Sequence, residues 1–395
     1  MRCCVYTRFV YEIPYLDSFI EHYLQLGFDK IIILYHDIEP YYLNEKLIEE
    51  VEIIFVENNG NKLLNEYKYL LEDDCDWVLN VDSDEFLVLD SKYESIQDYI
   101  AEKLAYEDEN INMFQFSWGW IHAFNPTPEY TLGDYLTKYK IFIGSKDTTG
   151  PEIWVKSLTK VENIEYMTCH NCVLNTPAVV YVDKRIEYHN SQHENDNICN
   201  NDNICNNDNN YDNNDENSDD DNSYNLLPRC YGPRDNTYSE AVLIHINTRN
   251  MMNGIIKGLN IHITQVKRKR IKKLKELKKF VNSFDTSKPI YKEMLTSFSN
   301  CIGYKIKFPL VCLKKEIINE KIRHLNIRTN GIQYKTPFCN TKYIPQQNKY
   351  HLDVLQEKMN SLFFVLDMDK FIKILNSFGV IFENTFIHNV QSSGL

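Results

Sequence analysis

The N-terminal part of the chain alternates short apolar runs with a helical pattern. The runs Cys3 to Tyr6, Ile31 to Tyr35 and Val51 to Val56 have the length and composition of buried strands. Between the first two runs, apolar residues recur at helical spacing, at Tyr15, Phe19, Ile20, Tyr23 and Leu24. Gly27 supplies a helix stop. The pattern predicts a strand–helix–strand unit, and therefore an α/β fold with a parallel sheet and a right-handed crossover.

A further helix is predicted over Leu63 to Leu71, before the apolar run Asp76 to Leu87 (DWVLNVDSDEFL) with its carboxylates Asp82 and Asp84. Side chains alternate along a strand, so residues i and i+2 point the same way. Such a pair at the end of a strand can bind one hard divalent cation. The alternative is that both aspartates merely cap a turn after a buried strand.

Charged residues follow several of the predicted strands. In open α/β sheets ligands bind beyond the carboxyl ends of the strands, so we expect Arg8, Asp37 and Asp82 to face one crevice. An apolar run before D-x-D also marks the nucleophile of haloacid dehalogenases, which have Thr or Val two residues past the second aspartate. Phe86 stands at that position and argues against this class.

Several short motifs follow one another in a fixed order along the chain: Glu12-Ile13-Pro14-Tyr15-Leu16, the helix end His22 to Gly27, Asp82-Ser83-Asp84-Glu85-Phe86-Leu87, Lys156-Ser157 and His245-Ile246. Together they resemble the GT-A glycosyltransferases, most closely the family-2-like and family-92-like (DUF23) group. The chain departs from the pattern of that group at Tyr11, where Asn is usual, and at Ile246, where Tyr is usual.

The resemblance implies a Rossmann-like, mostly parallel sheet flanked by helices over residues 1–260. Residues 261–395 would then form a mainly helical C-terminal region of unknown role. The implied reaction is metal-dependent transfer of a hexose, with inversion, from a nucleotide-diphosphate sugar to a glycan or protein acceptor.

The implied cofactor is Mn²⁺ or Mg²⁺. A metal that bridges the diphosphate oxygens stabilises the negative charge that gathers on the leaving group. By the resemblance, Asp84 would ligate the metal directly, and Asp82 would ligate it through water or hold the ribose.

Further contacts to the donor are expected from residues beyond the strand ends and from the motifs. Arg8 is expected to pair with the diphosphate and Asp37 to accept from a uracil or ribose group. The alternatives are a solvated loop charge for Arg8 and a turn residue for Asp37. Glu12 and Lys156 are expected at the donor site because they belong to the motifs.

Two histidines compete for the last metal ligand. His245 lies in the strand-like run AVLIHINTRN, and the resemblance implies that a histidine on such a late strand completes the metal site. His170, in YMTCHNCVL, is the weaker candidate, since a lone histidine among apolar residues is usually a core side chain. Its neighbours Cys169 and Cys172 form a single CxxC, which we interpret as ordinary thiols.

Aromatic residues crowd residues 114–126 (FQFSWGWIHAFNP), a segment that resembles the acceptor wall of this group. Trp118, Trp120 and His170 are therefore predicted to contact the acceptor, although the rings could equally fill the core. An inverting transferase needs a carboxylate base near the acceptor hydroxyl. Glu152 is the candidate and Asp134 the second choice.

Composition sets the class of protein. A chain of 395 residues, 43% of them hydrophobic, can bury a large core and exceeds the size of one typical domain. No run approaches the ~20 apolar residues that span a bilayer, and the N-terminus lacks the pattern of a signal peptide. The 11 cysteines, an odd count, predict free thiols in a reducing compartment. We expect a cytoplasmic enzyme of bacterial or viral type, or one held at a membrane by a partner.

Residues 194–225 are almost pure Asn and Asp, with DNICNN twice in tandem. Such a segment cannot bury a core and is predicted to be a disordered insertion within the GT-A-like domain. Its carboxylates account for much of the net charge of −13, which therefore says little about the active site.

A basic stretch, residues 267–281, carries an apolar stripe at helical spacing, formed by Ile271, Leu274, Leu277 and Val281. We predict a packed helix with a solvated basic face, and keep contact with an anionic membrane surface as the alternative. No nucleic-acid partner is expected. A second triplet, Asp367-Met368-Asp369, is interpreted as a turn or helix cap.

Two other functions compete with sugar transfer. The first is a catalytically degenerate transferase-like protein that binds a glycan or a partner, a hypothesis that Tyr11 and Ile246 support. The second is nucleotidyl transfer to a sugar phosphate, but the glycine-rich phosphate loop of that class is missing near the N-terminus.

Overall fold

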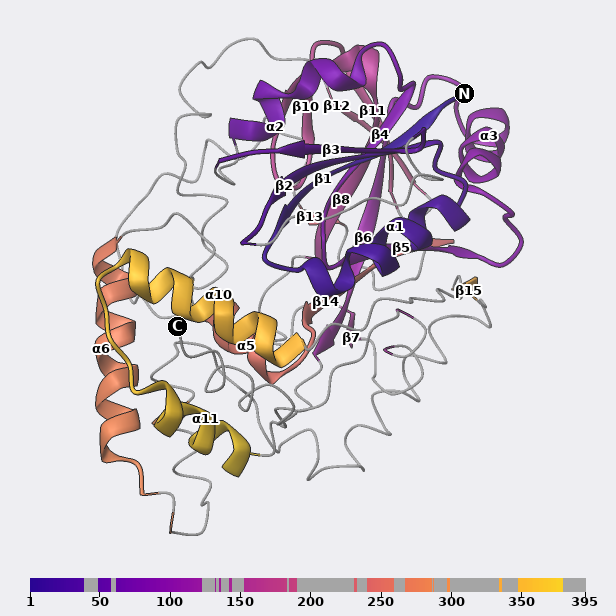
Figure 1. Cartoon of the computed structure of the whole chain (residues 1–395). Coiled ribbons are helices and arrows are strands. Elements are labelled where there is room, and N and C mark those ends of the chain that lie inside the picture. Colours follow the sequence, from indigo (N-terminus) through magenta and orange to yellow (C-terminus); the bar gives the residue numbers. More distant parts are fainter. Residues whose placement is uncertain are drawn as a thin grey trace, which may run out of the picture.

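The computed structural model describes residues 1–38, 49–57, 62–122, 132, 135, 142–143, 153–182, 185–189, 231–232, 240–258, 267–285, 287, 297–298, 334–335 and 347–378. Within these residues a 13-stranded sheet has helices on both sides and further helices at one end (Figure 1). The predicted α/β fold class is confirmed.

The N-terminal strands form the parallel half of the sheet, as the sequence predicts. The order is β4-β1-β2-β3, and every neighbouring pair in it is parallel. The strands are β1 (Cys3–Val10), β2 (Lys30–His36), β3 (Val51–Phe55) and β4 (Trp77–Asp82). In the register of β1 and β4, Arg8 pairs with Asp82, so both lie at the carboxyl edge of the sheet.

The other half of the sheet is mixed, which the sequence did not indicate. Strand β8 lies antiparallel between β4 and β6, β14 is parallel to β6, and β5 is antiparallel to β14. These strands are β5 (Glu85–Asp90), β6 (Met113–His122), β8 (Ile153–Lys160) and β14 (Ala241–Thr248). Shorter strands extend the sheet: β7 (Phe142–Ile143), β11 (Ala178–Val182), β12 (Arg185–His189), β13 (Tyr231–Gly232) and β15 (Tyr334–Lys335).

Alternate side chains of the parallel strands enter two separate cores. Cys3 and Val5 join the core under α1 (Leu16–Gln25) and α3 (Ile96–Tyr106). Cys4 and Tyr6 join the opposite core, with α2 (Lys62–Glu66) and the hairpin of β9 (Ile164–Met167) and β10 (Cys172–Leu174). This two-sided burial is why the strands are nearly continuous apolar runs.

Helix α1 ends where the sequence predicts. Gly27 follows it with φ +89°, a left-handed backbone that favours glycine. A Cβ at this position would lie 2.8 Å from the Cβ of Ser95, so the close approach of α3 also requires glycine.

The described helices of the C-terminal half gather beyond the carboxyl ends of the strands (Figure 1). They are α5 (Met251–Gly258), α6 (Lys267–Ser283), α10 (Gln347–Ser361) and α11 (Met368–Ser377). They share one core with Tyr11 and Ile13, the residues that follow β1. Leu274, Leu277 and Val281 of α6 are buried in it, which confirms the predicted packed helix.

Three local predictions need correction. Asp82 ends β4, but Asp84 lies in the turn before β5 and not on the same strand. The helix predicted over residues 63–71 is divided into α2 and a 3₁₀ turn, Lys68–Leu71. The cysteines are not all free thiols, because a disulfide joins Cys4 to Cys75. These two lie 71 residues apart in sequence, and only the pairing of β1 with β4 brings them together.

The smaller predictions have mixed outcomes. Asp367 is the N-cap of α11 and accepts from the backbone N–H of Lys370 at 2.9 Å, so the interpretation of the second D-x-D as a helix cap is confirmed. Residues 194–225 lie outside the described part of the chain. Among the residues that the structure describes, none of the helices combines the length and the apolar character that crossing a bilayer would take.

His22 of α1 makes folding sensitive to acid. Its Nε2 donates to the carbonyl of Leu87 at 2.7 Å, and burial lowers the pKa of the imidazole from 6.5 to about 4. In the unfolded chain His22 is therefore protonated below about pH 6.5, whereas in the folded chain it is protonated only below about pH 4. Stability falls across this window as the pH drops, with a slope of up to about 1.4 kcal/mol per pH unit from this residue.

We expect His22→Gln, which keeps a donor for Leu87, to flatten the stability profile between these pH values. Urea unfolding from pH 7 to pH 4 measures the effect. His351, whose pKa burial also lowers to about 4, provides a second contribution that remains in the variant. An unchanged slope would show that His22 is not a source of acid sensitivity.

Candidate functional site

The turn between β4 and β5 is the centre of the site. Asp82 ends β4, Ser83 and Asp84 form the turn, and Glu85 begins β5. Strand β14 lies alongside: His245 pairs with Glu85, and the N–H of Ile246 donates to the carbonyl of Asp84 at 2.8 Å. The D-x-D turn and His245 are therefore held together by the sheet itself.

Asp82 carries two cationic partners. Its Oδ2 accepts from Lys156 Nζ at 2.8 Å, and its Oδ1 lies 3.7 Å from Arg8 Nη2. Burial works against the charge of Asp82, but Lys156 and Arg8 outweigh it and keep the pKa of Asp82 lowered. Its side chain is 40% exposed, so the carboxylate remains open to a ligand. The predicted proximity of Arg8 and Asp82 is confirmed.

Asp84 is more enclosed. Its Oδ2 lies 3.4 Å from His245 Nε2 and accepts from Nζ of Lys257, a residue of α5. Burial opposes ionisation, but Lys257 and His245 outweigh it and hold the pKa of Asp84 well below its usual range. Asp84 in turn raises the pKa of His245 against the effect of burial. At neutral pH the aspartate is a carboxylate, with the ammonium of Lys257 on one side and the imidazole of His245 on the other.

Glu12 lies beneath the turn. Its Oε2 accepts from Ser83 Oγ at 3.0 Å and from Arg249 Nε and Nη2, both at 3.3 Å. Asn253 Nδ2 donates to its Oε1 at 3.3 Å, and Lys257 lies 3.4 Å from the same oxygen. Arg249 also donates to the carbonyl of Ser83 at 2.7 Å. Glu12 and Arg249 thus fix the position of the D-x-D turn.

Glu85 is a fully buried acid at the start of β5. Its Oε2 accepts from the backbone N–H of Asp82 at 2.7 Å and lies 3.2 Å from Lys156 Nζ. Burial raises the pKa of Glu85 to about 8, and Lys156 acts in the opposite direction. Lys156, itself buried, also donates to the carbonyl of Cys169 at 2.5 Å. These contacts tie the end of β4 to β8.

The comparison with known families agrees with this geometry. The sequence profile described as glycosyltransferase family 92 matches residues 64–276, more than half of the chain. The chain belongs to glycosyltransferase family 92. It is therefore a glycosyltransferase, and its GT-A-like fold is the expected one. No curated protein matches the sequence.

The matched segment of the transferase contains Asp82, Asp84, Lys156 and His245. Strands β1, β2 and β3 lie outside it, but they complete the same sheet. Strand β1 carries Arg8, and Glu12 lies just after its end. The match also runs past residue 260, the predicted domain boundary, into α6.

His170 and Trp118 lie at the inner side of the site. The Trp118 ring is 4.5 Å from the His245 ring and 5.4 Å from the His170 ring, and its side chain is 2% exposed. Burial, with the charge of Lys156, lowers the pKa of His170 to about 3, so the ring is neutral. Trp118 supports His245 in this arrangement, and acceptor binding by Trp118 and His170 stays a prediction.

Of the remaining predicted site residues, only Asp37 has a side chain that the structure describes. Asp37 follows β2, and its Oδ1 and Oδ2 both accept from the hydroxyl of Tyr350 on α10 at 2.6 Å. Trp120 belongs to β6, but its side chain lies outside the described part of the transferase. Glu152 and Asp134 also lie outside the described residues, so the predicted base stays a prediction.

Sequence reasoning missed Lys257, Arg249 and Glu85 as site residues. Lys257 and Arg249 lie in NTRNMMNGIIKG, directly after the strand of His245, where no spacing marks them as cations of the site. Glu85 is part of the quoted D-x-D-E motif. Its burial was the missing information.

The donor set of the transferase fits Mn²⁺ or Mg²⁺. Asp84 and His245 offer an oxygen and an imidazole nitrogen 3.4 Å apart, which Mn²⁺ accepts as ligands. Within the described ranges, no three His, Cys, Asp or Glu side chains gather into a preformed metal cluster. At nucleotide sites such metals use one or two protein ligands and substrate phosphate oxygens. A metal held between Asp84 Oδ2 and His245 Nε2 would compete with Lys257, which contacts the same oxygen.

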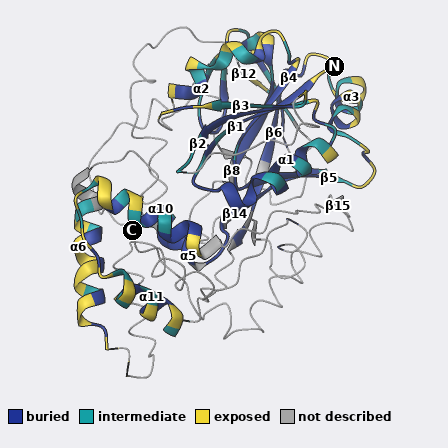
Figure 2. Ribbon diagram, in the orientation of Figure 1, coloured by how far each residue is buried: buried dark blue, intermediate teal, exposed yellow. Residues whose placement is uncertain are grey.

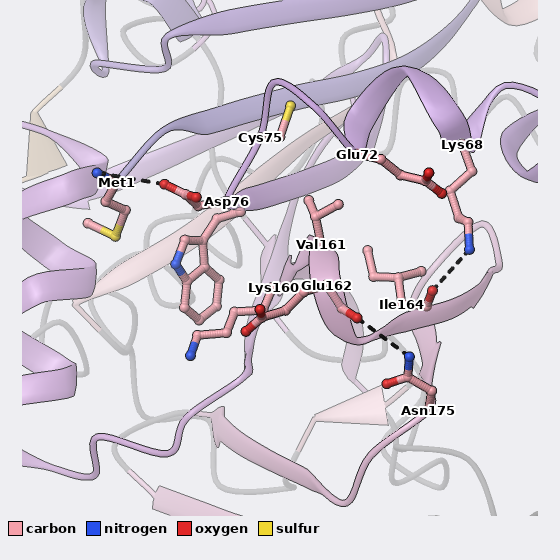
Figure 3. A pocket seen from close by; sticks show the side chains of 11 residues that line it. Met1, Lys68, Glu72, Cys75, Asp76, Lys160, Val161, Glu162, Ile164 and Asn175 are labelled. Carbon is pink, nitrogen blue, oxygen red and sulfur yellow. Dashed lines mark hydrogen bonds and ion pairs between the residues drawn. The ribbon is translucent and has the colours of Figure 1, made fainter.

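A separate cavity of about 690 Å³ lies at the other end of β4 (Figure 3). Trp77, the first residue of β4, lines it, together with Met1, Lys68, Lys160 and Glu162. Because Asp82 is the last residue of the same strand, this cavity is not part of the D-x-D site.

Proposed function

We propose that this glycosyltransferase moves a hexose from a nucleotide-diphosphate sugar to a glycan or protein acceptor, with inversion, and that Asp84 and His245 hold Mn²⁺ or Mg²⁺. The observation that carries the proposal is the turn at Asp82 to Asp84, which lies at the carboxyl edge of the sheet with His245 beside it. Ligands bind at this edge in open α/β sheets.

The charges around the turn suit a diphosphate. Arg8, Lys156 and Lys257 approach the two aspartates from β1, β8 and α5. Arg8 lies 3.7 Å from the partly exposed carboxylate of Asp82, and a guanidinium binds phosphate oxygens in pairs. Lys257, which pairs with Asp84 and Glu12, would add a further positive charge beside a bound diphosphate.

A bound metal would supply Lewis-acid stabilisation of the leaving diphosphate. The residues of the chain hold the two aspartates of the site in position. Lys156 and Glu85 hold Asp82 in place, and Glu12 and Arg249 hold the turn that carries Asp84. A site held by buried charged groups is rigid, as electrostatic stabilisation of a transition state requires.

A thermal-shift panel with UDP, GDP and their sugar conjugates, each with and without Mn²⁺, tests donor binding. A ligand at a hundredfold excess over its Kd adds about 2.7 kcal/mol to the free energy of unfolding. We expect a Mn²⁺-dependent rise of Tm with one nucleotide class, and slow hydrolysis of the matching sugar donor. Asp84→Asn serves as the negative control. A panel without any shift would contradict donor binding and favour the degenerate, partner-binding alternative.

A further inference from the structure

Helix α6 presents a lysine-rich face away from the core that it shares with α11. Lys272, Lys275, Lys278 and Lys279 are exposed, whereas the apolar stripe of the helix is buried. Nine lysines and arginines and one glutamate lie between residues 267 and 279, in a chain whose net charge is −13. Helix α6 is therefore strongly basic, and Figure 2 shows that much of its surface is exposed.

The connection between α10 and α11 exposes two large apolar side chains. Phe363 is 97% exposed and Val365 is 74% exposed, while Leu366 beside them is buried. The connection is well fixed, because the N–H of Phe363 donates to Asn360 at 2.9 Å and the N–H of Phe364 donates to Met359 at 3.0 Å. Phe363 has φ +53°, a strained backbone for an aromatic residue. The fold holds this ring in solvent at a conformational cost.

The lysine face and the apolar connection are neighbours. Lys278 Nζ lies 5.6 Å above the Phe364 ring, and Lys370 Nζ donates to the carbonyl of Asn282 at 2.8 Å. These contacts join α6 to the connection and to α11. In Figure 1 the connection runs along α6 before it enters α11. Cations and protruding apolar side chains therefore occupy one side of the molecule.

We propose that this surface, Lys272 to Lys279 with Phe363 and Val365, docks the protein onto an anionic phospholipid bilayer. Lysines attract anionic headgroups, and apolar side chains beside them enter the boundary between headgroups and acyl chains. A nucleic acid would also bind the lysines, but it would give the aliphatic Val365 no apolar environment. The net charge of the whole chain is −13, so an anionic membrane repels the chain as a whole and attracts this basic face.

Sedimentation of the full chain with vesicles tests the proposal. We expect binding to vesicles of phosphatidylcholine with 30% phosphatidylserine, and little binding to pure phosphatidylcholine. Each lysine near an anionic surface contributes about fivefold to partitioning, so Lys275→Gln/Lys279→Gln should weaken binding by about 25-fold. Phe363→Asn, a residue that tolerates positive φ, should weaken it by about tenfold without loss of Tm.

Matched variants elsewhere separate the docking surface from general charge and hydrophobicity. Lys62→Gln/Lys349→Gln removes two other exposed lysines, and Tyr106→Asn removes an 84% exposed ring at the end of α3. We expect both to bind as the wild type does. The proposal fails if wild type does not bind the anionic vesicles, or if the control variants lose as much binding. It also fails if the lysine variant binds the anionic vesicles as the wild type does and loses only its binding to single-stranded nucleic acid.

Discussion

Asp84→Asn is expected to lower kcat/KM for sugar transfer by about a thousandfold, the cost typical of removing one group that stabilises transition-state charge. Asparagine keeps the size of the side chain but removes the negative charge that Lys257 and His245 surround. It is also a poor ligand for a divalent cation. The folded state should persist, because Glu12 remains 3.4 Å from Lys257 and still compensates its charge. Transfer assays with the donor identified by thermal shift, together with the Tm of the variant, measure both effects.

The second D-x-D of the chain offers a matched control. Asp369 lies in the first turn of α11 and is exposed, and its triplet serves to cap that helix. Asp369→Asn should therefore leave kcat/KM unchanged. If Asp84→Asn and Asp369→Asn have the same activity, the turn at β4 is not the catalytic centre. If Asp84→Asn unfolds the protein, Mn²⁺ binding by wild type, followed by electron paramagnetic resonance, still decides whether the site takes a metal.

The features that the sequence predicted depend on neighbouring residues. Strands β1, β2 and β4 are nearly continuous apolar runs because both of their faces are buried, and Gly27 ends α1 because its φ is positive. The position of the D-x-D turn at the sheet edge follows from the same pattern. The N-cap role of Asp367 also follows from neighbouring residues, because its triplet stands directly before a helical pattern.

The features that the sequence did not predict depend on residues far apart in the chain. Lys257 reaches Asp84 across 173 positions, Arg249 reaches Glu12 across 237, and Cys4 bonds to Cys75 across 71. No periodicity encodes such pairs, since they arise from strand order. The antiparallel insertion of β8 between β4 and β6 brings Lys156 to Asp82, and that order is also invisible in a local pattern.

Arg249→Met is expected to destabilise the protein by about 3–5 kcal/mol, the cost of leaving a buried charge without its partner. Arg249 is fully buried, bonds Glu12 and the carbonyl of Ser83, and lies 3.9 Å from the Tyr15 ring. Without it, Glu12 keeps only Lys257 as a cationic partner among the described residues. The midpoint of urea unfolding measures the loss. Lys349→Met, which breaks the exposed pair with Asp353, should cost only about 0.3–0.5 kcal/mol.

A double-mutant cycle with Glu12→Gln identifies the origin of that cost. Glutamine carries no charge and keeps one acceptor oxygen, which can accept from Ser83 or from Asn253 but not from both, since these two bond different oxygens of Glu12. Arg249→Met in this background therefore leaves no carboxylate that has lost one of its two cations. We expect the double variant to recover about 2 kcal/mol relative to the sum of the single variants, within the range of coupling between contacting charges. Additive losses would mean that Arg249 acts through its other contacts, the carbonyl of Ser83 and the Tyr15 ring. The Kd of the nucleotide then separates two roles of Glu12. If Glu12 is purely structural, Glu12→Gln changes the stability and leaves this Kd unaltered. If Glu12 binds the donor, the substitution changes both.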